Sequence, residues 1–181
     1  PPVVPKNIHV DMTPAQRRIY KAVEDAESGK YYDEVLDDLE FEDIPSELAK
    51  YARLGQVAES AEIVGGAEGK KGSGKLKELE VLIDEIVERN EKAVVFSRSK
   101  RFTLIMAKFF SKYNPAVIHG DISAQAKANQ DVSDRQAQVD KFMEDDSCKV
   151  IFCTESASRE GWTGTEGNNV IFTSKPWSSA Y

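Results

Sequence analysis

Residues 92–119, KAVVFSRSKRFTLIMAKFFSKYNPAVIH, decide the predicted fold. Two short apolar runs, KAVVFS at 92–97 and AVIH at 116–119, are typical of strands buried on both faces. Between them, RFTLIMAKFFSKY at 101–113 has the apolar spacing of a helix. A strand, a helix and a second strand in this order form a βαβ unit, in which the two strands lie parallel in one sheet.

The same alternation continues on both sides of this stretch. Helices are predicted for LKELEVLIDEIVERN at 76–90 and, capped by Ser133, for SDRQAQVDKFMED at 133–145. KVIFCT at 149–154 and NNVIFTS at 168–174 are predicted as the third and fourth strands. The sequence therefore predicts an α/β fold, with a parallel sheet that has helices on both faces.

Residues 1–72 are predicted to form a helical N-terminal segment ahead of the α/β domain, which occupies 73–181. In MTPAQRRIYKAVEDA, Thr13 has the position of a helix cap and Pro14 suits the first turn. Gln16 stands where a capping box requires Glu or Gln. These three residues predict a helix that begins at Pro14.

A second helical region is predicted at 46–63, after the acidic stretch DEVLDDLEFEDIPSE at 33–47. This stretch carries eight acids and no base, and the net charge of the whole chain is −7. The acidity is therefore local, and it does not argue against a nucleic-acid partner for the rest of the chain. Val35, Leu36 and Leu39 favour a helix with one solvated face here.

The glycine-rich stretch GKKGSGK at 69–75 fits the first seven positions of a phosphate-binding P-loop. A working P-loop follows a strand and has Ser or Thr after its lysine to hold magnesium. Here Leu76 follows Lys75, and no convincing strand precedes the glycines. We interpret the stretch as a Gly- and Lys-rich loop that ends where a helix begins, with Ser73 as the N-cap.

The ends of the four predicted strands are rich in hydroxyl groups, with basic groups nearby. Ligands of parallel sheets lie beyond the carboxyl ends of the strands. These polar ends favour an anionic backbone or phosphate groups over an apolar ligand. The four ends are Ser97-Arg98-Ser99, His119-Gly120-Asp121, Thr154-Glu155-Ser156 and Thr173-Ser174-Lys175.

Cys148 and Cys153 are the only cysteines. Five positions apart along a strand, they would point to opposite faces, so no disulfide is expected between them. With no signal peptide and no membrane-length apolar run, the sequence predicts a cytoplasmic or nucleoid-associated protein that is not secreted. No metal site is expected, because His119 lacks a His, Cys or Glu partner at ligand spacing.

Cys153 and Arg159 suggest one alternative function. A cysteine and an arginine separated by five residues, between a strand and a helix, form the pattern of cysteine-dependent phosphatases. Against it, Phe152 replaces the usual histidine, and Glu155 would put a negative charge beside the phosphate.

A second alternative is a non-catalytic interaction domain of the same fold, with the acidic stretch as its docking surface.

Taken in order, six segments resemble the second RecA-like lobe of superfamily-two helicases, most closely the Swi/Snf-like ATP-dependent DNA translocases. The resemblance covers about residues 8–181 and implies a RecA-like fold of the P-loop NTPase type. It also implies a parent protein that is an ATP hydrolase, with ATP and Mg²⁺ between two lobes. The six segments are MTPAQRRIY, SGKLKELEVLIDEI, KAVVFSRS, VIHGDIS, DRQAQVDKF and VIFCTESASREGWTGTEGNNVIFTSKPWSSAY.

The resemblance also implies roles for individual residues. KAVVFSRS is similar to helicase motif IV, and TESASREGW is similar to motif V. The implied contacts to the nucleic-acid backbone are Ser97, Arg98, Ser99, Gly120, Thr154 and Ser156. Glu160 and Gly161 are implied on the ribose side of ATP. The link from 124 to 132 is longer than is usual in the family.

The motif VI arginines are expected beyond Tyr181, and the P-loop is expected in a lobe before Pro1. The resemblance therefore implies no catalytic residue in this chain, no cofactor held by it alone, and no ATP hydrolysis by it alone. The implied partners are DNA, with duplex DNA favoured, and an N-terminal RecA-like lobe, with no membrane.

Overall fold

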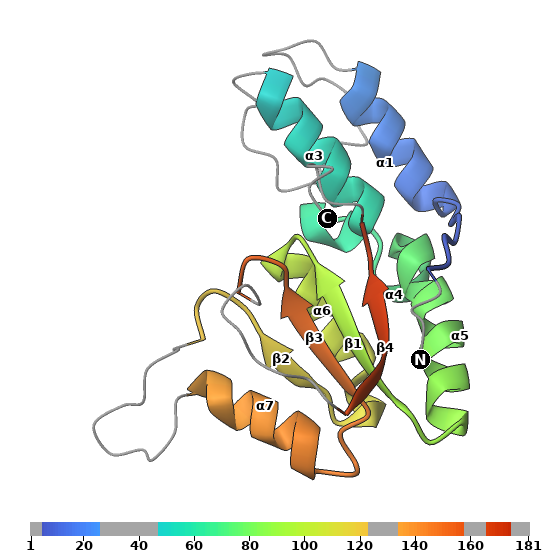
Figure 1. The fold of residues 1–181 in the computed structure, drawn as a ribbon. Coiled ribbons are helices and arrows are strands. Elements are labelled where there is room, and N and C mark those ends of the chain that lie inside the picture. The colour runs from blue at the N-terminus through green and yellow to red at the C-terminus, as the bar shows by residue number, and fades with distance from the viewer. Residues whose placement is uncertain (1–4, 26–46, 123–133, 158–165, 175–181) are drawn as a thin grey trace. The chain divides into compact units, whose positions relative to one another are not determined.

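The computed structural model describes residues 5–25, 47–122, 134–157 and 166–174 (Figure 1). The chain divides into two compact units, Pro1–Glu78 and Leu79–Tyr181. Within the described residues, no helix has both the length and the apolar character needed to cross a membrane.

The second unit contains a parallel sheet with the strand order β2-β3-β1-β4. All three strand pairs are parallel, as the βαβ pattern predicted. Val95 at the centre of β1 is in register with Phe152 of β3 and Ile171 of β4. The strands are β1 (Lys92–Ser97), β2 (Ala116–Ile118), β3 (Val150–Thr154) and β4 (Gly167–Phe172).

Helices α6 (Lys100–Phe109) and α7 (Asp134–Glu144) cover opposite faces of this sheet (Figure 1). On one face, α7 buries Val139 and Phe142 in a cluster that includes alternate residues of β1 and β3. On the other face, the ring of Phe110, just after α6, lies 5.7 Å from the ring of Phe152. The predicted helices on both faces are therefore confirmed.

The predicted helix at 101–113 ends earlier than its apolar pattern suggested. The α-helix stops at Phe109, and a 3₁₀ turn follows from Ser111 to Tyr113. Asn114 then has a φ of 46°, a left-handed conformation that ends the turn. The turn directs the chain into β2.

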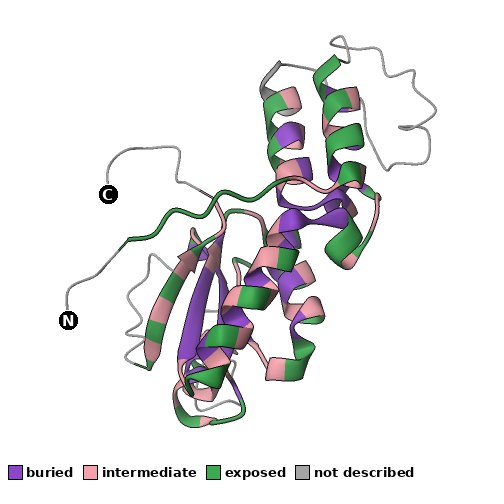
Figure 2. Cartoon of the chain, turned by 90° about the vertical axis from the view of Figure 1, so that its right-hand side faces the viewer, coloured by how far each residue is buried: buried purple, intermediate pink, exposed green. Residues whose placement is uncertain are grey.

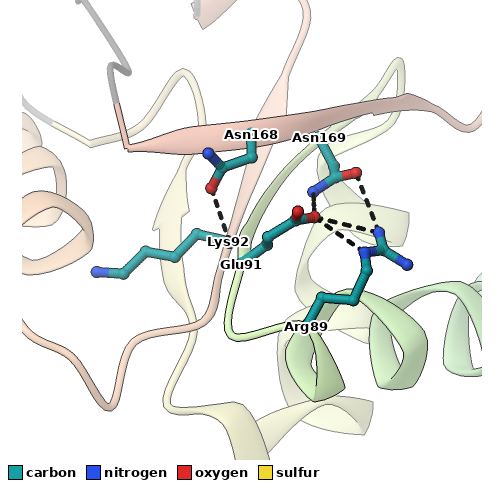
Figure 3. Close-up of polar contacts among 5 residues, drawn as sticks. All are labelled: Arg89, Glu91, Lys92, Asn168 and Asn169. Atoms are coloured by element: carbon teal, nitrogen blue, oxygen red, sulfur yellow. Dashed lines mark hydrogen bonds and ion pairs between the residues drawn. The ribbon is translucent and has the colours of Figure 1, made fainter.

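Strand β4 lies at the edge of the described sheet and alternates between half-buried and exposed residues (Figure 2). Its register against β1 shifts at Asn168, whose side-chain oxygen accepts a hydrogen bond from the Lys92 N–H at 3.4 Å. Asn169 and Arg89 both donate to Glu91, at 2.8 and 3.2 Å (Figure 3). These two hydrogen bonds hold the pKa of Glu91 below its usual value. Side chains thus tie β4 to β1 where the backbone ladder is irregular.

Both cysteines are buried, and neither forms a disulfide in the structure, as the sequence led us to expect. The reason given for it was wrong, because Cys148 and Cys153 belong to the same apolar cluster. Cys148 lies before β3 begins, where the strand alternation does not apply. Burial raises the pKa of the Cys148 thiol.

The first unit is helical, as predicted. It contains α1 (Pro14–Asp25), α3 (Glu47–Glu59), a 3₁₀ helix (Ala61–Val64) and α4 (Gly69–Gly72), and α5 (Gly74–Glu88) begins in it. The predicted helical region at 46–63 is interrupted at Ser60, whose side chain caps the 3₁₀ helix.

The capping box at the start of α1 is confirmed. The Thr13 N–H donates to Gln16 Oε1, and the Gln16 N–H donates to Thr13 Oγ1, each at 3.1 Å. Gln16 is also 1% exposed, and its Nε2 donates to the Val57 carbonyl at 2.8 Å. Its Oε1 accepts from the Gly74 N–H at 2.8 Å. One glutamine therefore links the starts of α1 and α5 to the end of α3.

In the GKKGSGK stretch, α4 is followed directly by α5, and no strand occurs among the described residues 47–72. Ser73 caps α5 as predicted, accepting from the Leu76 N–H at 3.1 Å. The predicted loop is wrong, because Gly69–Gly72 forms one helical turn. A Cβ added to Gly72 would collide with the Ala67 carbonyl oxygen, and one added to Gly74 with the Asp11 carbonyl oxygen. These two glycines therefore serve close packing of the backbone.

Candidate nucleic-acid interface

The carboxyl ends of the parallel strands form one edge of the sheet, which the arrowheads mark in Figure 1. Beyond the strands, the Glu155 N–H donates to the Ser97 carbonyl at 2.9 Å. On the other side of β1, the Thr173 N–H donates to the Phe96 carbonyl at 3.0 Å. The segments after β3 and β4 are thereby held against the end of β1. We call this edge the strand-end surface and define it by residues 97–101, 119–121 and 154–156.

The turn after β1 is built by two serine side chains. The hydroxyl of the buried Ser97 lies 3.2 Å from both the N–H and the carbonyl oxygen of Ser99. Ser99 Oγ accepts from the Phe102 N–H at 3.3 Å and caps α6. Arg98, between them, is exposed. The two hydroxyls thus shape the turn, while the guanidinium group is the part of it that faces solvent.

Two further basic residues follow this turn, and the sequence analysis did not single them out. Lys100 and Arg101 open α6 and are exposed like Arg98. The signal was present in the sequence, since the string is SRSKR. The structure shows where these residues lie. Arg98, Lys100 and Arg101 are all found between the carboxyl end of β1 and the first turn of α6. Three basic side chains at one strand end suit a polyanion.

The loop after β2 carries His119, Gly120 and Asp121. Lys100 forms an ion pair with Asp121 and a hydrogen bond to it, which hold the pKa of this carboxyl below its usual value. The His119 Nδ1 accepts from the Asp121 N–H at 3.3 Å. Burial, and next the charge of Lys100, lower the pKa of His119, which favours its neutral imidazole. A Cβ added to Gly120 would meet nothing within 4 Å, which leaves the surface open there.

The segment after β3 contains Thr154, Glu155 and Ser156. Thr154 ends β3 in register with Ser97 and is 3% exposed, whereas Ser156 is exposed. Glu155 Oε1 is buried and has no hydrogen-bond partner in the described part of the chain. Six residues were predicted to contact the nucleic-acid backbone. Of these six, the structure exposes Arg98, Gly120 and Ser156 to solvent. Ser99 is half-buried, and Ser97 and Thr154 are buried.

The two predicted ATP contacts, Glu160 and Gly161, lie outside the described residues. Arg159, Ser133 and most of the acidic stretch at 33–47 do so as well. Among the side chains that are described, no group of three or more His, Cys, Asp or Glu residues could hold a metal ion. The ATP side of the predicted site therefore stays a prediction.

Burial argues against the phosphatase alternative. Cys153 is 0% exposed inside β3, in register with Phe96 of β1 and Ile118 of β2. A nucleophilic thiolate has to reach its substrate and needs a polar, partly open environment. Cys153 instead belongs to the apolar cluster under α7.

The parallel sheet with helices on both faces and a polar carboxyl edge defines a RecA-like α/β domain. The family model "Helicase conserved C-terminal domain" matches residues 74–181, and the chain belongs to this family. No curated protein sequence matches the chain.

Three solved structures from Sulfolobus solfataricus show the same fold. The SWI2/SNF2 ATPase C-terminal domain is 21% identical, with a TM-score of 0.69 over 93% of this chain and 70% of that one. The SWI2/SNF2 ATPase core domain is 21% identical, with a TM-score of 0.70 over 93% of this chain and 33% of that one. The same core in complex with dsDNA is 20% identical, with a TM-score of 0.67 over 93% of this chain and 34% of that one. This chain thus has the fold of the C-terminal lobe of SWI2/SNF2 ATPases and spans about a third of their core.

Proposed function

We propose that this chain is the second motor lobe of an ATP-dependent DNA helicase or translocase, which contacts the nucleic-acid backbone through the strand-end surface. The observation that carries the proposal is the exposed basic group formed by Arg98, Lys100 and Arg101 at the start of α6. Membership of the helicase C-terminal family supports it. So does the dsDNA complex of a Sulfolobus SWI2/SNF2 ATPase core with the same fold.

The chemistry of this surface fits phosphate groups. Guanidinium and ammonium groups form charge-assisted hydrogen bonds with phosphate oxygens, and the N-terminal end of α6 favours negative charge. The surface offers a cation at Arg98, an open backbone at Gly120 and a hydroxyl group at Ser156. Contacts of this kind position a protein on nucleic acid without reading the base sequence. Such binding suits a motor that moves along DNA of any sequence.

ATP and Mg²⁺ are proposed to bind between this lobe and an N-terminal RecA-like lobe of the parent protein, with Glu160 and Gly161 on the ribose side. The P-loop of that first lobe would hold the phosphates. Closure of the two lobes around ATP would then move the strand-end surface along the backbone.

The isolated chain is expected to show no magnesium-dependent ATP hydrolysis, because phosphoryl transfer needs groups that we assign to the other lobe. Phosphate release is measured with purified chain and ATP, with and without Mg²⁺ and duplex DNA. Turnover that rises with Mg²⁺ and with chain concentration would show that the chain carries its own catalytic groups.

Duplex DNA is expected to bind weakly, with equal affinity for two unrelated sequences and with strong dependence on salt. Replacing Arg98 by alanine should weaken binding and reduce the slope of log K against log salt by about 1. Lys108→Ala is the matched control, since Lys108 is an exposed cation in the last turn of α6. If both variants bind DNA equally well, Arg98 is not a backbone contact.

A further inference from the structure

The first unit contains a cavity of about 740 Å³ that the proposed function does not use. It lies between the extended residues 9–13, the start of α1, the short helix α4 and the first turn of α5. This volume is within the range of small-molecule and cofactor sites, roughly 300–1,000 Å³. The charged and hydroxyl-bearing residues of its lining include Asp11, Thr13, Lys70, Lys71, Lys77 and Glu78.

The charges around this cavity favour an anion. Lys70 and Lys71 reach it from α4, and Lys77 reaches it from α5. The carboxyl group of Asp11 lies 3.6 Å from the guanidinium of Arg17, which offsets its charge. Glu78 is the remaining acid among the described lining residues. Lys71 and Lys77 alone therefore outnumber the remaining carboxylate of the lining, that of Glu78.

The N-terminal ends of two long helices add to the positive charge around the cavity. Thr13 and Pro14, at the start of α1, and Gly74, at the start of α5, all line the cavity. Neither helix has an acidic residue in its first turn, although acids are favoured there. Lys77 stands in the first turn of α5, where the helix dipole disfavours a cation. A bound anion would offset both the helix dipoles and the lysine charges.

The backbone that carries the lysines is held by several contacts. Thr13 Oγ1 donates to the Lys71 carbonyl at 2.7 Å, which fixes α4 against the start of α1. The Gly74 N–H donates to the buried Gln16, and the Gly74 backbone packs directly against the Asp11 carbonyl. The close packing of the glycine-rich stretch therefore sets the backbone positions from which the exposed side chains of Lys71 and Lys77 extend.

We propose that this lysine-lined cavity is a second anion site, which binds a phosphate-bearing ligand. The chemistry recognised is a run of phosphate groups, either the phosphodiester backbone of a nucleic acid or a free oligophosphate. The site shares no residue with the strand-end surface, so the proposal does not depend on that surface. The GKKGSGK stretch thus supplies lysines to a phosphate site of a different kind from a P-loop.

The experiment titrates the full chain with sodium tripolyphosphate and, separately, with a short duplex DNA, by calorimetry and by amide chemical shifts. Tripolyphosphate is expected to bind and to shift the amides of Lys71 and Lys77. The double variant Lys71→Gln/Lys77→Gln should weaken its binding roughly tenfold or more, because two charged contacts are lost. Lys21→Gln, an exposed cation of α1 outside the cavity, should leave it unchanged.

Duplex DNA that shifts the same two amides and displaces tripolyphosphate would identify nucleic acid as the source of the phosphates. Tripolyphosphate binding without displacement by DNA would identify a free oligophosphate. The proposal is overturned if neither ligand shifts these amides, or if the double variant binds as tightly as Lys21→Gln. Since the amide shifts are read on the unaltered chain, a folding defect of the variant does not obscure the result. Arg98→Ala tests the strand-end surface separately, so the two proposals can fail independently.

Discussion

A Gly74→Ala variant should lose roughly 3 kcal/mol of stability in the first unit, because its new Cβ would overlap the Asp11 carbonyl oxygen. This oxygen belongs to the backbone and cannot rotate away as a flexible side chain would. To relieve the overlap, the backbone at residue 74 would have to move, and this movement would strain the hydrogen bond from its N–H to Gln16. The loss should therefore spread to α1 and the end of α3, which Gln16 connects.

Hydrogen exchange measured by mass spectrometry provides the local readout for this prediction. Peptides from α1 and α3 should lose protection, since opening free energies are specific to each region. Gly55→Ala is the control, because a Cβ at that exposed position in α3 meets nothing within 4 Å. Alanine should stabilise the helix there by about 0.5–1 kcal/mol. Unchanged protection in Gly74→Ala would show that the close approach to Asp11 does not hold in solution.

Lys92→Ala is expected to destabilise the second unit by about 2–4 kcal/mol. Lys92 is 7% exposed, and its Nζ donates to the carbonyls of Phe142 and Asp145 at 2.6 and 3.0 Å. These carbonyls lie at the end of α7, where helix carbonyls lack partners of their own. The stem also packs near Phe142, with Nζ 5.5 Å from the ring centroid. Alanine would remove both the donor and the packing.

Urea unfolding of three variants separates these two contributions. Lys92→Met keeps most of the buried stem and removes the donor, so it should cost less than Lys92→Ala. Lys149→Ala is the control, since Lys149 makes an exposed hydrogen bond to Asn90 and should change stability by less than about 0.5 kcal/mol. Equal unfolding midpoints for Lys92→Ala and Lys149→Ala would show that Lys92 does not fix the end of α7.

The strands and most helices could be predicted because their signals are local. KAVVFS and KVIFCT are apolar runs of strand length, and the capping box of Thr13 and Gln16 is visible in four consecutive residues. The buried contacts of Gln16 could not be predicted, because its partners Val57 and Gly74 are 41 and 58 positions away. The turn of helix at 69–72 was missed for a similar reason, since glycine has low helix propensity and tertiary packing decides there.

The candidate site was predicted as a set of strand ends, and the structure adds which side chains face solvent. Ser97 and Arg98 are neighbours in sequence, yet one is buried in its turn and the other is exposed. The exposure of these two side chains depends on how β1, β3 and the start of α6 pack together. No local sequence pattern carries that information. The ion pair between Lys100 and Asp121 joins the start of α6 to the loop after β2, 21 positions apart, so the sequence did not suggest it.

The central claim is that the strand-end surface contacts the DNA backbone. Its most direct test is a titration of isotope-labelled chain with a short duplex of arbitrary sequence, followed by amide chemical shifts. If this contact forms, the largest shifts within the second unit fall at residues 97–101, 119–121 and 154–156, and they shrink as salt is raised. Shifts confined to other parts of the second unit, such as the exposed face of β4, would show that the strand-end surface does not contact DNA. The absence of any shift in that unit at low salt would show the same.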